Sequence, residues 1–305
     1  MNIVIGAFGY IGRYIARHLL EQGEQVRTIT THPDKPNPFG ERVQAFPLNF
    51  DRPDTLVEDL RGASALYNTY WIRFPYGGAS FEQAVQNTAT LFGCAREAGV
   101  RKIVHISVTQ ASATSDLPYY RGKARQEQAL IDSGVPYCIV RPTLVFGKED
   151  ILVNNIGWLI RKFPFFPIFG SGQYKVQPVF VEDLARIAVA SAGEPGNFTI
   201  DAIGPETFSF EGLVKLIAAR IKPSVRLAHI PPSLGILLGR IIGIGLGDVV
   251  LTRDELKGLM DELLTSSQIP NGTTCFSNWL ESNGDQLGSS YSSEIQRHFK
   301  WRSAD

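Results

Sequence analysis

A tyrosine and a lysine four residues apart form the pair in this chain that is best suited to proton transfer. Tyr119 and Lys123 follow Pro118, which favours the first turn of a helix, so both side chains lie on one helical face. A phenol has an ordinary pKa of about 10, and an ammonium group one turn away favours the phenolate. The hydroxyl of Ser107 or Thr109, at the end of the preceding expected strand, could hold a substrate carbonyl. The arrangement predicts that Tyr119 exchanges a proton beside a cofactor that transfers hydride.

Three glycines near the N-terminus indicate a phosphate-binding turn. Gly6, Gly9 and Gly12 follow an apolar run and open a helical pattern. Gly6 allows a sharp turn, Gly9 removes a Cβ where a diphosphate would approach, and Gly12 lets the helix pack closely against its strand. Amide groups of the turn then point at the anion, and we expect cofactor contacts from Phe8, Gly9, Tyr10 and Ile11. No lysine follows that would indicate a nucleoside-triphosphate loop.

The end of the second expected strand bears on which dinucleotide binds. In doubly wound folds an acidic residue there binds the ribose 2′-hydroxyl, whereas a basic residue accepts a 2′-phosphate. The strand expected at 25–30 is followed by Thr31 and His32, and no carboxylate closes it. The sequence therefore predicts NADP or NAD as the cofactor and slightly favours NADP. Asn49 and Phe50, at the end of the next expected strand, are expected to contact the adenosine.

Strands and helices alternate through the first part of the chain. Strands are expected at 1–5, 25–30, 43–50, 64–69 and 102–107. Helices are expected between them at 11–23, 53–60 and 81–98. Parallel strands joined by right-handed crossovers follow from this alternation, so we expect an α/β fold with a doubly wound parallel sheet. Inside the fifth strand, His105 is expected to be a core residue with its hydrogen bonds satisfied. Asp116 and Pro118 mark the start of the following helix.

The composition argues against several functional classes. Lys and Arg together number 30, as do Asp and Glu, so the chain has no net charge to attract nucleic acid. The three cysteines are isolated in sequence and are expected to be reduced, and no residues show the spacing of metal ligands. An apolar strand starts at the second residue without a leader peptide, so we expect a cytoplasmic protein.

The second half of the chain is expected to form a smaller C-terminal substrate lobe. Residues 1–150 and 176–202 are assigned to the nucleotide-binding core, and residues 151–175 and 203–305 to the lobe, which closes with a short helix at 291–301. An aromatic stretch at 158–169 suggests a small and partly apolar substrate, and plain core packing explains it about equally well. The sequence leaves the substrate and the oligomeric state open.

The most apolar stretch of the chain lies at 233–247. Arg240 interrupts this stretch, and each side is far shorter than the ~18 to 20 residues that span a bilayer. The stretch could cover the substrate pocket, form a subunit interface or lie on a membrane surface, in that order of preference.

These motifs together resemble the short-chain dehydrogenase/reductase superfamily. The resemblance rests on Gly6-x-x-Gly9-x-x-Gly12, on Tyr119-x-x-x-Lys123 and on the segment from Ser133 to Thr143. Within the superfamily, the chain is similar to the extended and atypical branches, above all to the NmrA-like group and the NAD(P)H-binding accessory subunit of respiratory complex I. The resemblance implies a Rossmann fold, an acid/base role for Tyr119 and a contact between Lys123 and the nicotinamide ribose.

Two functions are compatible with this resemblance. The first is an NAD(P)H-dependent oxidoreductase, or an epimerase/dehydratase that uses transient hydride transfer. The alternative is a non-catalytic NAD(P)(H)-binding protein that regulates a partner or supports the assembly of a complex. Tyr119 and Lys123 favour catalysis because a sensor has no need of a positioned phenol. Val108 interrupts the run of serines usual in the extended branch, so the catalytic hydroxyl is Ser107 or Thr109, and the register slightly favours Thr109.

Overall fold

The structure is a computed structural model that describes residues 1–299, and the chain divides into two compact units. Among the described residues, the first unit contains Met1–Pro142 and Val181–Ala202, and the second contains Thr143–Phe180 and residues 203–299. In the second unit, α11 covers Glu294–His298. A helix was expected at 291–301 and the lobe was expected to extend to 305. Residues 300–305 lie outside the described residues, so the end of both expectations is not described.

A seven-stranded sheet in which every neighbouring pair is parallel forms the centre of the first unit. Its strand order is β11-β6-β5-β4-β1-β2-β3, so the direction of winding reverses at β1. The predicted doubly wound α/β fold is confirmed. The strands are β1 (Asn2–Ile5), β2 (Val26–Thr30), β3 (Val43–Pro47), β4 (Ala65–Asn68), β5 (Lys102–Ile106), β6 (Tyr137–Pro142) and β11 (Phe198–Ala202).

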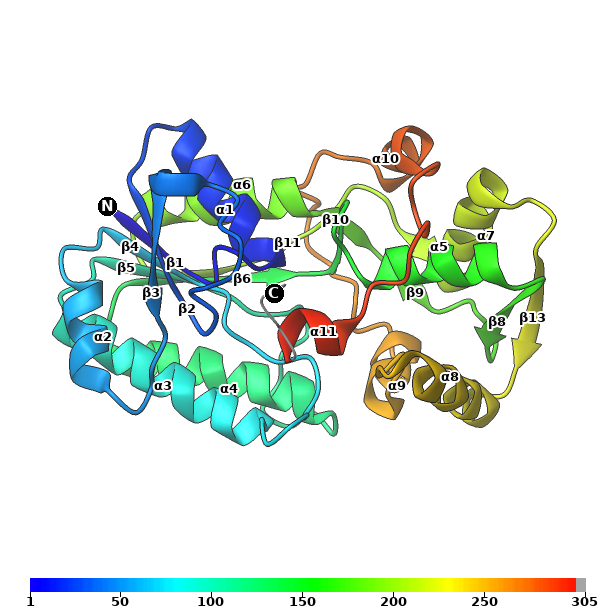
Figure 1. Ribbon diagram of the computed structural model, residues 1–305, viewed down its shortest axis with the longest axis horizontal. Coiled ribbons are helices and arrows are strands. Elements are labelled where there is room, and N and C mark those ends of the chain that lie inside the picture. The colour runs from blue at the N-terminus through cyan, green and yellow to red at the C-terminus, as the bar shows by residue number, and fades with distance from the viewer. Residues whose placement is uncertain (300–305) are drawn as a thin grey trace. The chain divides into compact units, whose positions relative to one another are not determined.

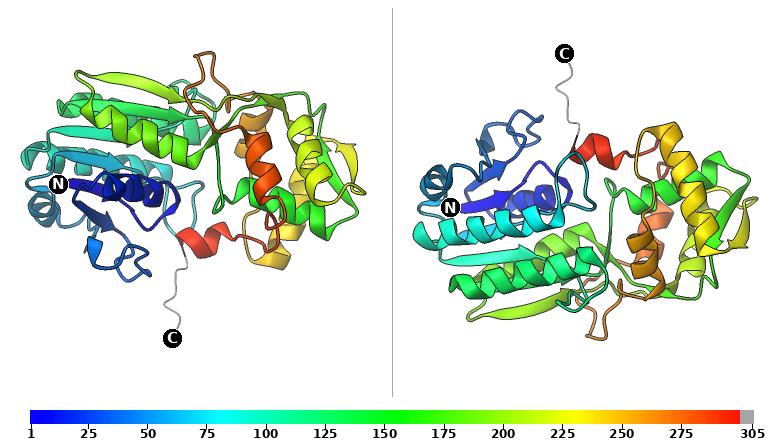
Figure 2. Two further views of the ribbon diagram at one scale, coloured as in Figure 1. Left: turned by 90° about the horizontal axis from the view of Figure 1, so that it is seen from above. Right: turned by 90° about the horizontal axis from the view of Figure 1, so that it is seen from below.

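Helices cover both faces of this sheet. One face carries α1 and α6, which contact each other, and the other carries α2, α3 and α4 (Figure 1). Figure 2 shows α1 and α6 in front of the strands from above, and α3 and α4 in front of them from below. The helices are α1 (Tyr10–Glu21), α2 (Pro53–Leu60), α3 (Phe81–Glu97), α4 (Pro118–Ser133) and α6 (Val181–Gly193), with a short 3₁₀ turn η1 (Gly40–Arg42) before β3.

Burial explains why the central strands were recognisable. Every residue of β1, β4 and β5 is buried, as expected for parallel strands with helices on both faces. The edge strand β3 is shorter than the expected 43–50 and ends at Pro47. The reason is local, because the side-chain Oδ1 of Asn49 accepts a hydrogen bond from the Asp51 amide at 3.0 Å and turns the chain. Asn49 and Phe50 therefore lie in a loop.

The second unit contains short strand pairs and helices around its own apolar core, which includes Phe146, Phe210 and Phe276. The aromatic stretch at 158–169 is divided between two elements, because α5 (Leu152–Lys162) ends before the stretch is complete and β8 (Phe165–Phe169) forms its last part. The other elements are β7 (Leu144–Phe146), β9 (Lys175–Val176), β10 (Pro178–Phe180), β12 (Phe208–Ser209), β13 (Arg226–Ile230), α5 (Leu152–Lys162), β8 (Phe165–Phe169), α7 (Phe210–Ile221), α8 (Pro232–Leu246), α9 (Arg253–Met260) and α10 (Phe276–Asn283).

Candidate functional site

The glycine turn joins β1 to α1 with little space for side chains. Gly6 has φ of +73°, a left-handed conformation that favours glycine, and its carbonyl accepts a hydrogen bond from the Gly9 amide at 2.8 Å. A Cβ added to Gly12 would lie 2.3 Å from that same carbonyl oxygen. Gly12 was expected to let the helix pack closely against its strand. The structure shows that Gly12 packs closely against the backbone of Gly6 and Ala7, in the turn between that strand and the helix.

The N-terminus of α1 is open to an anion. Gly9 occupies the N-cap position and supplies no side-chain acceptor to the first helical amides, and the first turn contains no acidic residue. Tyr10 and Ile11 begin the helix, and Phe8 is buried in the turn before it. Uncapped amides and the positive end of a helix favour a phosphate group, so the residues present fit the diphosphate of a dinucleotide.

Thr28 on β2 holds this turn in place, a contact that the sequence did not predict. Its hydroxyl donates a hydrogen bond to the carbonyl of Val4 at 2.8 Å and accepts one from the amide of Ala7 at 3.0 Å. The side chain is fully buried. The only sequence signal was a polar residue in the middle of an apolar strand.

The residues expected at the ribose and adenine lie on the loops that follow β2 and β3. Thr31 is exposed, and His32 is partly buried with its amide donating to the Thr30 hydroxyl at 3.3 Å. The ring of Phe50 packs against Tyr70, with 5.2 Å between the ring centroids. Asn49 is exposed, and its Oδ1 is occupied by the Asx turn described above.

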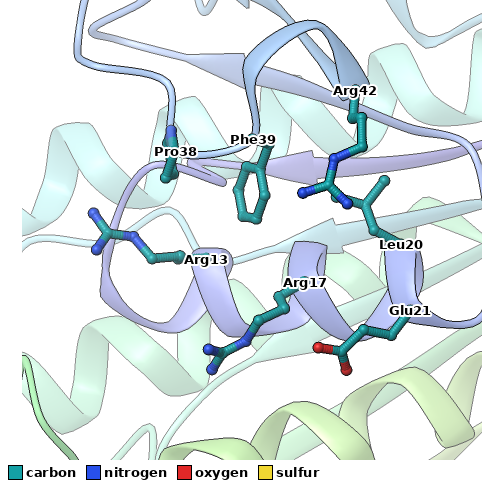
Figure 3. Close-up of a pocket in the computed structure, with 7 residues that line it drawn as sticks. All are labelled: Arg13, Arg17, Leu20, Glu21, Pro38, Phe39 and Arg42. Carbon is teal, nitrogen blue, oxygen red and sulfur yellow. The ribbon is translucent and has the colours of Figure 1, made fainter.

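A cavity of about 310 Å³ lies between α1 and the segment before β3, and three arginines line it (Figure 3). Its lining residues are Arg13, Arg17, Leu20, Glu21, Pro38, Phe39 and Arg42. Arg13 directly follows Gly12, and its Nη2 donates to the carbonyl of Phe8 in the glycine turn at 3.4 Å. Arg17 forms an ion pair with Glu182 at 2.8 Å. Neither Arg13 nor Arg42 was predicted from the sequence. For Arg13, its position directly after Gly12 was an available signal.

Tyr119 and Lys123 come together around the indole ring of Trp71. The helix begins at Pro118 as predicted, but Leu117 rather than Asp116 occupies the N-cap. The Tyr119 ring meets Trp71 edge to face at 5.8 Å, and Lys123 Nζ lies 4.9 Å from the centre of the same ring. A Cβ added to Gly122 would lie 2.6 Å from the indole, so this glycine lets Trp71 reach α4.

Lys123 is buried, and its environment changes its protonation. Nζ donates a hydrogen bond to the carbonyl of Ile106, the last residue of β5, at 2.9 Å. Burial lowers the pKa of Lys123 to about 7, and the negative charge of Glu127 opposes that shift. Both protonation states of this amine are therefore accessible near neutral pH.

The two candidate hydroxyls differ in their surroundings. Ser107 is buried, and its Oγ donates to Glu127 Oε1 at 2.5 Å. Arg141 Nε and Nη2 donate to the same carboxylate at 2.8 and 2.5 Å, which makes a bidentate pair. Thr109 is fully buried, and its amide donates to the carbonyl of Pro142 at 3.1 Å. The network around Glu127 joins residues that are far apart in sequence, and the sequence reading did not include it.

His105 has only part of its hydrogen bonding satisfied. The Asn68 amide donates to Nδ1 of the ring at 3.0 Å, whereas Nε2 is buried without a hydrogen-bond partner among the described residues. Burial lowers the pKa of His105 well below its ordinary value, and the charge of Lys123 adds to that effect. The expectation of a satisfied core histidine is therefore correct for one nitrogen and wrong for the other.

Across residues 1–299, no group of three or more His, Cys, Asp or Glu residues could hold a metal ion. Over the same residues, no helix combines the length and the apolar character that crossing a membrane requires.

Comparison with known proteins relates the N-terminal half of the chain to a known family. Residues 6–152 match the family described as NAD(P)H-binding. The chain is 28% identical over 239 residues to the mitochondrial NADH dehydrogenase (ubiquinone) 1 alpha subcomplex subunit 9 of Arabidopsis thaliana. This match covers 75% of the chain and 60% of the relative, so the chain spans about three fifths of the relative's length.

Solved structures with low sequence identity share the fold. A nucleoside-diphosphate-sugar epimerase from Staphylococcus aureus has a TM-score of 0.71 at 16% identity, covering 97% of this chain and 99% of that chain. The triphenylmethane reductase of Citrobacter sp., solved as a complex with NADP(H), has a TM-score of 0.66 at 17% identity, covering 97% and 98%. The predicted resemblance and the predicted class of cofactor are confirmed. Residues 6–152, just under half of the chain, therefore match the NAD(P)H-binding family, and the chain shares its fold with this epimerase and this reductase.

Proposed function

We propose that the protein is an NADP(H)-dependent oxidoreductase of the short-chain type, acting on a small and partly apolar substrate. The observation that carries this proposal is the meeting of Tyr119 and Lys123 around Trp71, on the first turns of α4. Lys123 reaches the carboxyl end of β5, and ligands of open α/β sheets bind at the carboxyl ends of the strands. The glycine turn follows the carboxyl end of β1, in the same unit.

Each residue has a role in this proposal. The turn from Gly6 to Gly12 holds the diphosphate, and the bound nicotinamide supplies or accepts hydride. Tyr119 gives a proton to the substrate oxygen or takes one from it, and a protonated Lys123 favours the phenolate that this exchange produces. The Thr109 or Ser107 hydroxyl orients the substrate oxygen. The same groups would serve epimerase or dehydratase chemistry.

The preference for NADP(H) rests on charge near the end of β2. No carboxylate follows Thr30 directly to repel a 2′-phosphate, and Thr31 and His32 take its place. Arg13 adds a guanidinium that reaches the glycine turn and lines the cavity beside it. A guanidinium binds phosphate through charge-assisted hydrogen bonds, which supports Arg13 as the partner of the 2′-phosphate.

Two tyrosine substitutions test the catalytic proposal. NADPH oxidation is measured against a panel of quinones, aldehydes and ketones, and NADPH affinity is measured by calorimetry. Tyr119→Phe should lower kcat by roughly a hundredfold or more, because a general acid is lost, with an unchanged affinity for NADPH. Tyr120→Phe is the matched control, since Tyr120 points about 100° away around the helix and is buried. Equal turnover by the wild type and Tyr119→Phe would contradict the catalytic role of Tyr119.

The alternative is a non-catalytic NAD(P)(H)-binding protein that regulates a partner or supports an assembly. Two candidate catalytic groups already make hydrogen bonds within the protein, which supports this alternative. The Ser107 hydroxyl donates to Glu127, and the Lys123 amine donates to the Ile106 carbonyl. The Arabidopsis relative is named as a subunit of a larger complex and as mitochondrial, so the cytoplasmic location of this chain stays a prediction. Tight NADPH binding without turnover on any substrate of the panel would favour this alternative.

A further inference from the structure

Helix α8 turns three glycines and Ile236 inward and leaves four large aliphatic side chains exposed. A Cβ added to Gly235 would lie 2.4 Å from the ring of Phe169, and one added to Gly243 would lie 2.5 Å from the carbonyl oxygen of Asp248. Gly239 is buried on the same side of the helix. Because these glycines make close contacts, α8 cannot rotate to bury its larger side chains without a clash. The outward face is therefore fixed by the fold.

The outward face carries a continuous aliphatic stripe. Leu234, Leu237, Ile241 and Ile244 are 41%, 53%, 58% and 84% exposed, at the spacing of three, four and three residues that aligns side chains along one helical face. The stripe runs for about 15 Å along the helix. A row of large aliphatic side chains in water is unfavourable, so this face is one that a binding partner would cover.

The helix that carries the stripe has a positive charge, and the start of α9 carries both signs, with Asp254 and Glu255 next to Arg253. Arg240 is the only charged residue of α8, and Arg253 lies at the start of α9, the neighbouring helix in Figure 1. Neither guanidinium takes part in an ion pair within residues 1–299. Arg253 and Ile236 line a cavity of about 370 Å³ between the two helices, where Lys257 is already paired with Asp261. The helix that carries the stripe has no carboxylate of its own.

We propose that α8 docks on the surface of a membrane that contains anionic lipids. The four aliphatic side chains enter the boundary between headgroups and acyl chains, while Arg240 and Arg253 contact lipid phosphates. A second copy of the chain fits less well, because the stripe exposes on the order of 400 Å², about half of the ~800 Å² per partner that stable interfaces bury. Among the readings that the sequence left open for 233–247, the structure thus favours the membrane surface.

Co-sedimentation with lipid vesicles tests the proposal. The full chain is mixed with vesicles of phosphatidylcholine alone or of phosphatidylcholine and phosphatidylglycerol at three to one. We expect binding to the anionic vesicles that is at least fivefold stronger than to the neutral ones and that weakens with salt. Ile244→Glu should lower binding at least tenfold, whereas Ile269→Glu should not, although Ile269 is 87% exposed and lies in the same unit.

Further variants separate the parts of the proposal. Arg240→Gln combined with Arg253→Gln should remove the preference for anionic vesicles, and Leu237→Glu should reproduce the effect of Ile244→Glu. Thermal melts check that each variant remains folded. The proposal is overturned if the wild type does not bind anionic vesicles or if Ile244→Glu binds them as well as the wild type. It is also overturned if light scattering shows a dimer that Ile244→Glu dissociates, because the stripe then serves a second copy.

Discussion

Replacing Gly12 with alanine should weaken both the fold and the nucleotide site, and the structure indicates by how much. The added methyl group would lie 2.3 Å from the carbonyl oxygen of Gly6, 2.8 Å from its carbonyl carbon and 3.2 Å from the Cα of Ala7. All three are backbone atoms, so no side-chain rotation relieves the overlap. The first turn of α1 would have to move away from the glycine turn.

The energy of this change has two opposing parts. Alanine favours the helical conformation over glycine by about 1 kcal/mol. Overpacking against a rigid neighbour costs roughly 1 to 3 kcal/mol or more. Because the clash at Gly12 is with backbone atoms, the cost lies in the upper part of this range, about 2 to 3 kcal/mol, and we expect Gly12→Ala to lower the free energy of unfolding by about 1 to 2 kcal/mol. Since displacement of α1 also moves the amides that would bind the diphosphate, NADPH affinity should fall at least about tenfold.

Thermal unfolding and NADPH calorimetry measure the two effects in parallel. Gly93→Ala is the matched control because Gly93 lies inside α3 and a Cβ there would meet nothing within 4 Å. That control should raise the free energy of unfolding by roughly 0.5 to 1 kcal/mol through helix propensity alone. If Gly12→Ala were as stable as Gly93→Ala and bound NADPH with the wild-type affinity, the close contact with Gly6 would have no energetic role.

Two other predictions concern charge. Arg13→Gln should weaken NADPH binding at least about tenfold and leave NADH binding unchanged, because only NADPH carries the 2′-phosphate. Calorimetry measures both affinities, and Arg17→Gln is the control. Equal losses of affinity for the two nucleotides would contradict a contact between Arg13 and the 2′-phosphate. For Lys123, the pKa is 10.5 in the unfolded chain and about 7 in the fold, so the unfolded chain binds more protons between these values. Urea unfolding should show wild-type stability rising from pH 7 to 10 relative to Lys123→Met, and parallel pH profiles would refute the lowered pKa.

Local signals explain most of what the sequence predicted correctly. The strands were recognisable because apolar residues fill both faces of β1, β4 and β5, and Pro118 marked the start of α4. The predicted ends of elements were less accurate where two local signals competed. The Asx turn at Asn49 shortened β3, and Leu117 took the N-cap expected near Asp116.

Contacts between distant residues were beyond the sequence. The pair of Glu127 on α4 and Arg141 on β6 depends on how the two elements pack, and nothing in the spacing of 14 residues indicates it. The packing of Trp71 between Tyr119 and Lys123 likewise depends on Gly122, which by pattern alone is an unremarkable helical glycine. The candidate site was therefore predicted as a set of residues, whereas its electrostatics required the fold.

The position of β11 has a consequence for the order in which the chain folds during synthesis. β11 pairs with β6 along Phe198–Ala202, but the ribosome makes Thr143–Phe180 of the second unit before it makes β11. Until then, β6 has an unpaired edge, which is a site for incorrect strand pairing. The family match ends at residue 152, before both α6 and β11. A nucleotide-binding half expressed alone would therefore need residues 181–202 fused to it, or it would aggregate through the free edge of β6.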